Sequence, residues 1–184
     1  MKKENTFTLK TENKNRNTAT AVVVLAVAAV LLAIDQMLKY FVLRDLRPVG
    51  TVTVIPGLLE LTYVENTGAA FGLFKQVMWL VVAVTVVATV AIIVLLFRYK
   101  RHSFFSYTTA ALLMSGGIGN LIDRIAHGFV VDYIDFRIIH YAIFNFADSC
   151  VVVGAVLLCL YLIRLELRES KAKKGQHAET TEDR

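Results

Sequence analysis

Four long apolar stretches limit what this chain of 184 residues can fold into. They cover residues 19–43, 77–97, 104–122 and 144–163, and each is long enough for a helix to cross the roughly 30 Å hydrocarbon core of a bilayer. Because backbone groups in lipid must be hydrogen-bonded within their own segment, we expect four transmembrane helices. The composition agrees, since 56% of the residues are hydrophobic and only 19% are charged. The sequence therefore predicts an all-α membrane protein.

The basic residues indicate how these helices cross the membrane. Lys and Arg gather before the first stretch, in "RYKRH" (98–102), and after the fourth stretch. With four crossings these segments share one side, which the positive-inside rule makes cytoplasmic. Both termini are then cytoplasmic, and residues 44–76 and 123–141 are extracytoplasmic. A cleaved secretory signal is the alternative for the first stretch, and cleavage would leave the other orientations unchanged. The net charge of +5 does not predict a nucleic-acid partner, because no basic face is interleaved with aromatic residues.

The two extracytoplasmic segments differ in pattern. "TVTVIPGLLELTYV" (51–64) alternates Thr with Val, turns at Pro-Gly and continues into a second mixed run, which is typical of two strands joined by a turn. We expect a β-hairpin or small sheet over about 48–75 that rests on the helix ends, because a few strands are not stable alone. The second segment, 123–141, is expected to be a loop. The chain then divides into a disordered polar tail at 1–18, a four-helix domain at 19–165 and a second disordered tail at 166–184.

Two acids stand at the edges of the apolar segments. Asp148 lies about one turn inside the fourth stretch, and Asp132 lies in the apolar "FVVDYIDF" after the third. A charge at the centre of a membrane helix costs roughly 2.5 to 3.5 kcal/mol, so such acids are candidates for function. The loop allows the two to meet at the outer membrane edge, where two poorly hydrated carboxylates share one proton. Such a pair can act as base and acid on water and a leaving group. A structural role is the alternative that the residues alone leave open.

Four sequence blocks make the chain resemble the bacterial lipoprotein signal peptidases, also called signal peptidase II, which are integral membrane aspartyl proteases. The blocks are "IDQMLKYFV" (34–42), "VENTGAAFGLF" (64–74), "GGIGNLIDRIAHGFVVDYIDF" (116–136) and "FNFADSC" (144–150). The resemblance implies a catalytic dyad of Asp132 and Asp148, and Tyr133 stands where the family often has Phe. It implies seven polar residues around the dyad, namely Asp35, Lys39, Asn66, Asn120, Asp123, Arg124 and Asn145.

The function implied by the resemblance is removal of the signal peptide from diacylglyceryl-modified prolipoproteins, just before the lipid-modified Cys. The enzyme would work in the bacterial inner membrane with its site at the extracytoplasmic face, surrounded by membrane lipids. The resemblance further implies a monomer without metal or cofactor that binds the family's cyclic peptide inhibitors. The His and Cys residues also show no metal-ligand spacing. Two other classes are a small proton-coupled transporter, which would spread acids through several helices, and a non-catalytic scaffold.

Several of the polar residues have structural interpretations as well. Asp35 and Lys39 are one helical turn apart and are expected to pair. Asn145 precedes the fourth helix and is expected to cap it. Asp123 and Arg124 are expected to form an ion pair or a helix-end anchor. Close helix packing is expected at Gly116, Gly117 and Gly119. Asp135 is expected to be a polar side chain at the surface. Asn66 and Asn120 are expected either to hydrogen-bond to backbone groups or to contact substrate.

Overall fold

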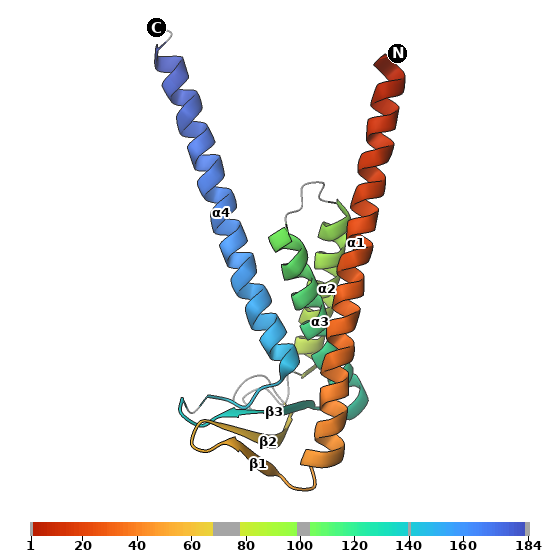
Figure 1. Ribbon diagram of the computed structural model, residues 1–184, viewed down its shortest axis with the longest axis vertical. Helices are drawn as coiled ribbons and strands as arrows, with labels where there is room; N and C mark the ends of the chain where they lie inside the picture. The colour runs from red at the N-terminus through yellow and green to blue at the C-terminus, as the bar shows by residue number, and fades with distance from the viewer. Residues whose placement is uncertain (1, 68–77, 99–103, 140, 183–184) are drawn as a thin grey trace.

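A computed structural model describes residues 2–67, 78–98, 104–139 and 141–182. Helices rise from one side of a small sheet, and the two longest helices diverge so that both chain ends lie far from it (Figure 1). The elements in chain order are α1 (Lys2–Phe41), a π-helical turn η1 (Val42–Leu46), β1 (Thr51–Ile55), β2 (Leu59–Asn66), α2 (Met78–Arg98), α3 (Phe104–His127), β3 (Val130–Phe136) and α4 (Phe146–Glu182).

The four predicted apolar stretches are helical. Within the described residues, two helical segments are long and apolar enough to cross a membrane, Thr20–Leu46 and Phe146–Arg168. The helix α2 contains a shorter apolar run, Val82–Val94. The helix α3 is continuous, but its apolar sequence is interrupted by the polar residues of "SGGIGNLIDR". The chain is therefore mostly helical with two clear candidate spans, and the crossing of all four helices stays a prediction.

The helices α1 and α4 are longer than the sequence predicted. Helix α1 begins at Lys2 and α4 ends at Glu182, so both cover residues expected to be disordered tails. Neither tail contains proline. Extending an existing helix adds one hydrogen bond per residue without a new nucleation cost, and polar residues such as Lys and Glu are good helix formers. The division of the chain into tails and a central domain stays a prediction.

A three-stranded antiparallel sheet lies at the end of the helices, with strand order β1-β2-β3. The predicted hairpin is present, with Thr51 opposite Thr62 and a turn at Gly57, whose φ is 74°. The rest of the predicted β element, residues 68–77, lies outside the described residues. The loop predicted for 123–141 is wrong in its centre, because β3 pairs with β2 along its length. The β-branched run "VV" and the residues after it supply the strand preference, and the pairing sets Asp132 opposite Val64.

Two clusters of buried residues hold the helices and the sheet together. In the first, small residues of α1 meet α3, and in the second, η1 meets β3. The second cluster fixes the sheet against the end of α1, so the strand that carries Asp132 cannot move independently of that helix. The first comprises Ala21, Val24, Ala28, Ala110, Ala111 and Met114, and the second comprises Val42, Leu46, Val131 and Tyr133.

Glycines allow α3 to approach its neighbours closely. A Cβ on Gly116 would meet the carbonyl oxygen of Ala147 and lie 2.8 Å from Cγ2 of Val151, both in α4. A Cβ on Gly119 would meet the carboxylate of Asp35 in α1. These two contacts confirm the predicted close packing. A Cβ on Gly117 would instead make an ordinary contact of 3.4 Å with Thr85 of α2.

Candidate active site

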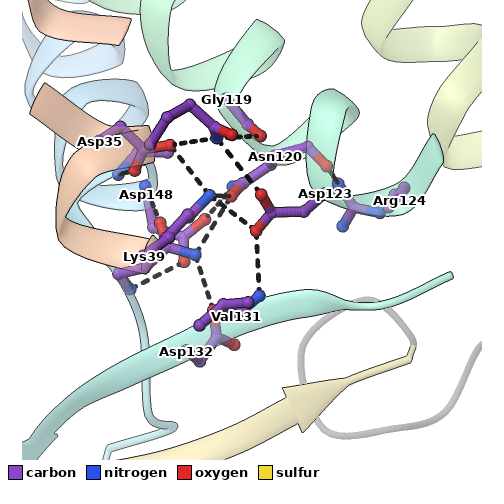
Figure 2. A network of polar contacts seen from close by, with 12 residues as sticks. Asp35, Lys39, Gly119, Asn120, Asp123, Arg124, Val131, Asp132 and Asp148 are labelled. Atoms are coloured by element: carbon purple, nitrogen blue, oxygen red, sulfur yellow. Dashed lines mark hydrogen bonds and ion pairs between the residues drawn. The ribbon is translucent and has the colours of Figure 1, made fainter. Parts of the chain in front are cut away.

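Asp132 and Asp148 come from different elements that meet where the sheet joins the helices (Figure 2). Asp132 lies on β3, and Asp148 lies in the first turn of α4. An isolated bridge between Ile134 and Phe144 returns the chain from β3 to the start of α4. This short return brings the two acids into one polar network, although 15 positions separate them in the sequence.

Asn145 joins the two acids. Its side-chain oxygen accepts the N–H of Asp148 at 2.9 Å, and its own N–H donates to Asp148 Oδ2 at 3.2 Å. This reciprocal arrangement is a capping box and confirms the predicted helix cap. The side-chain nitrogen of Asn145 donates to Asp132 Oδ1 at 2.7 Å. Asn145 is fully buried, so its orientation is fixed by these bonds, and it couples the start of α4 to β3.

Two further asparagines complete the hydrogen bonding of the two carboxylates. Asn66, the last residue of β2, donates to Asp132 Oδ2 at 2.8 Å. Asn120 of α3 donates to Asp148 Oδ1 at 2.7 Å. Each oxygen of both acids thus accepts an N–H bond. Amide donors hold a carboxylate in place without adding a charge, so the pair is oriented but is not neutralised by a bonded cation.

Lys39 is a buried cation beside this pair. Its Nζ lies 3.0 Å from Asp35 Oδ2 and 2.9 Å from Asp123 Oδ2, and it donates to Asn120 Oδ1 at 2.9 Å. The pair with Asp35 confirms the predicted local interaction. All three ammonium protons therefore have acceptors, as a lysine that is only 2% exposed requires. Through Asn120, the same cation is connected to Asp148.

The two acids around Lys39 also hold main-chain groups of the site. Asp35 Oδ1 accepts the N–H of Ala147 in the first turn of α4 at 3.0 Å. Asp123 Oδ2 accepts the N–H of Val131, the residue before Asp132, at 3.0 Å. Each acid therefore anchors the segment that carries one member of the dyad. Neither role is visible in the sequence, because both bonds end on backbone atoms of distant residues.

Two sequence-based expectations differ from the structure. Asp123 pairs with Lys39, whereas Arg124 donates to the carbonyl oxygen of Asn120 at 3.2 Å. Adjacent helical side chains point in different directions, which disfavours the predicted Asp123–Arg124 pair. Asp135 is buried rather than at the surface and accepts from Thr62 at 3.4 Å.

Gln36 is a site residue that the sequence analysis missed. Its side-chain nitrogen donates to Asp35 Oδ2 at 3.2 Å, to Asp123 Oδ1 at 3.3 Å and to the carbonyl oxygen of Gly119 at 3.3 Å. The signal was present in "IDQMLK", where Gln36 stands between two residues of the predicted site. All nine predicted residues lie in this one network, and their roles in a reaction stay predictions.

The environment of Asp132 favours its protonated form. The pKa of this carboxyl is raised to about 6, mainly by burial and in part by the nearby charge of Asp148. The donors from Asn66 and Asn145 oppose this rise. A carboxyl whose pKa is near 6 can hold a proton in mildly acidic solution and release it near neutrality, as acid–base chemistry requires.

Comparisons with known proteins agree with this geometry. The sequence profile of the family described as signal peptidase (SPase) II matches residues 27–164. The chain is 46% identical over 140 residues to a lipoprotein signal peptidase of Clostridioides difficile (strain 630), which covers 76% of this chain and 94% of the relative. It is 37% identical over 151 residues to that of Enterococcus faecalis (strain ATCC 700802 / V583), covering 82% and 92%.

Solved structures share the fold. A bacterial membrane enzyme determined at 2.3 Å resolution superposes with a TM-score of 0.71 at 30% identity, covering 77% of this chain and 88% of that chain. A second, determined at 1.9 Å, gives a TM-score of 0.69 at 31% identity and covers 76% and 92%. The family match spans most of the chain and includes every residue of the polar network. The chain therefore belongs to the signal peptidase II family of membrane peptidases.

Proposed function

We propose that this peptidase removes signal peptides from diacylglyceryl-modified prolipoproteins, and that Asp132 and Asp148 activate the water that cuts the chain. One observation carries the proposal. Two acids from different elements are held by the same asparagine, with Asn145 donating to Asp132 at 2.7 Å and capping Asp148 at 2.9 Å. Every oxygen of both acids is hydrogen-bonded, and among the described residues neither acid is bonded to a cation, so one proton can be shared between them.

The two acids have different environments, which suggests their roles. Both acids lie in one buried network, and we assign the shared proton to Asp132, whose carboxyl has its pKa raised by burial to about 6. Asp148 accepts N–H bonds at the start of α4, where the helix dipole favours a negative charge. Asp148 then takes a proton from water as its oxygen attacks the scissile carbonyl carbon. Asp132 protonates the carbonyl oxygen, which gives a gem-diol. The proton held by Asp148 then passes to the leaving nitrogen as the C–N bond breaks, and Asp132 takes back a proton from one gem-diol hydroxyl as the carboxylic acid forms. The titration belongs to the pair.

The position of the site fits a substrate that arrives from the membrane. The network lies at the sheet end of the helices, and both chain ends lie at the opposite end (Figure 1). If the basic termini are cytoplasmic, this arrangement puts the dyad at the extracytoplasmic face. The signal peptide's apolar segment and the diacylglyceryl chains could then stay in the bilayer. All nine site residues come from one chain, so a monomer suffices.

The test is cleavage by the purified protein in detergent or lipid. We expect it to cut a diacylglyceryl-modified precursor just before the modified Cys, as mapped by mass spectrometry, and to leave the unmodified precursor intact. Chelators and serine-directed reagents should have no effect, whereas the family's cyclic peptide inhibitors should block the reaction. Equal cutting of both precursors would contradict the substrate proposal. A complete lack of cutting would favour a transporter or a scaffold.

The dyad is tested by two isosteric variants and a control on the same strand. Asp132→Asn and Asp148→Asn should each lower kcat by about 10³-fold or more, because neither amide can exchange the proton. Asp135→Asn changes another buried acid of β3 that bonds to Thr62, and it should retain cleavage. A dyad variant that keeps the wild-type rate would refute the assignment, provided that size-exclusion profiles show folded protein.

A further inference from the structure

The hydroxyl of Tyr133 is a buried polar group without a partner among the residues that the structure describes. Tyr133 follows Asp132 on β3 and is 6% exposed. Its ring packs with Val42 and Leu46 of η1. Burying a hydroxyl without a hydrogen bond costs about 1 to 3 kcal/mol, so an unpaired group at this position calls for an explanation. The Phe that this family often has at the same position would avoid the cost of an unpaired hydroxyl.

Tyr133 contacts the chain on both sides of Asn145. Its N–H donates to the carbonyl oxygen of Phe144 at 3.1 Å. The N–H of Phe146, the first residue of α4, lies near its phenol oxygen without forming a hydrogen bond to it. The side chain thus ends at the N-terminus of α4, which is the element that carries Asp148.

Negative charge lies close to this hydroxyl. The acid that acts on it most strongly is Asp35, followed by Asp132. Asp35 Oδ1 already accepts the N–H of Ala147, and a carboxylate oxygen has a second lone pair. Burial raises the pKa of the Tyr133 phenol, so the group keeps its proton and can donate it to a neighbour. A donor, a main-chain N–H and a carboxylate therefore converge on one place.

We propose that the Tyr133 hydroxyl binds one buried water molecule at the junction of β3, α1 and α4, and that Tyr133 is thereby a positioning residue for Asp148. The water accepts from the hydroxyl and from the N–H of Phe146 and donates to Asp35, which gives it the usual number of about three hydrogen bonds. It adds a second link between Asp35 and the first turn of α4, next to the bond at Ala147. The inference rests on the proposed function, because it concerns the geometry of one member of the dyad.

The first test is Tyr133→Phe, which removes only the hydroxyl. Loss of one hydrogen-bonded link should lower kcat on the lipid-modified precursor by about 2- to 10-fold and leave KM unchanged, because the hydroxyl is too buried to contact substrate. Tyr141→Phe removes an exposed hydroxyl and should change neither constant. Wild-type kcat in Tyr133→Phe would overturn the positioning role.

The second test is a diffraction structure of the wild type that shows ordered solvent. We expect a solvent oxygen within hydrogen-bond distance of Tyr133 Oη, and its loss in Tyr133→Phe. A Tyr133 hydroxyl without a solvent neighbour would overturn the water site. A Tyr133→Phe protein that unfolds at a higher temperature than the wild type would also overturn it, because removing a hydroxyl stabilises a protein only where that hydroxyl is unsatisfied. If the wild type fails to cut any precursor, the proposed function fails, but the water site is still decided by the diffraction structure.

Discussion

Asn145 Nδ2 lies 2.7 Å from Asp132 Oδ1, while the oxygen of the same amide caps the helix that carries Asp148. One side chain therefore sets both the position of the strand acid and the start of α4. A primary amide can do both because it offers a donor and an acceptor in one plane. A carboxylate here would repel Asp132, and a hydroxyl would be too short to reach it.

Two substitutions of Asn145 distinguish its role as the cap of α4 from its hydrogen bond to Asp132. In Asn145→Ser the hydroxyl can still accept the N–H of Asp148, so the helix start should persist. The bond to Asp132 is lost, and we expect kcat to fall by about 10- to 100-fold because a buried carboxyl oxygen left without its donor costs about 1 to 3 kcal/mol. Asn145→Ala should lose the cap as well and destabilise the protein by about 1 kcal/mol more. Kinetics and thermal unfolding in detergent measure the two effects. Wild-type kcat in Asn145→Ser would refute the bridging role.

Lys39 should be essential for stability. Lys39→Met leaves Asp35 and Asp123 buried without their cation, and removing one partner of a buried ion pair costs about 3 to 5 kcal/mol. Thermal or denaturant unfolding in detergent should show this loss directly. Arg44→Ala serves as the control, since it breaks an ion pair with Asp45 at the surface and should leave the unfolding midpoint unchanged. A small effect of Lys39→Met would mean that water reaches the two acids.

Hydropathy located all four helices, because each of them contains a long apolar run. Alternating Thr and Val located the hairpin, because one of its strands is exposed. The third strand escaped detection because nearly all of its residues are buried, and a run buried on both faces does not alternate. The pair proposed as the dyad was singled out through the resemblance. Gln36 and the anchoring bonds of Asp35 and Asp123 were not predicted. These contacts end on backbone groups of other elements, and the sequence alone does not show which of those groups the fold brings close.

Gly119 should tolerate no side chain. A Cβ there would meet the Asp35 carboxylate, whose Cγ would lie 3.1 Å away. Gly119→Ala must displace Asp35 from Lys39 and from the N–H of Ala147, so we expect a loss of about 1 to 3 kcal/mol in stability and slower cleavage. Gly117→Ala is the matched control, because its Cβ would lie 3.4 Å from Thr85. The control should be neutral or slightly stabilising, since alanine is the better helix former. Equal effects of both changes would argue against the close contact.

Asp132 should make the folded protein less stable as the pH rises from about 4 to about 6. Burial raises the pKa of this carboxyl from 3.8 to about 6 on folding, so the folded state binds the proton more tightly than the unfolded state. The stabilisation from this proton is fully present below the unfolded-state pKa of 3.8. It disappears as the pH rises through the folded-state pKa of about 6. A shift of this size corresponds to on the order of 3 kcal/mol.

The measurement is the free energy of unfolding of the wild type relative to Asp132→Asn, in detergent, between pH 4 and pH 7.5. Because the variant lacks the titrating group, the wild type should lose stability relative to it across this range and then level off above about pH 6. The variant should be inactive throughout, so above about pH 6 the substitution should remove activity while it avoids the cost of a buried, charged carboxylate. Such a trade-off is expected where a buried acid is kept for chemistry. A difference that does not change with pH would show that Asp132 is solvated in the folded protein and is not the acid that holds the proton.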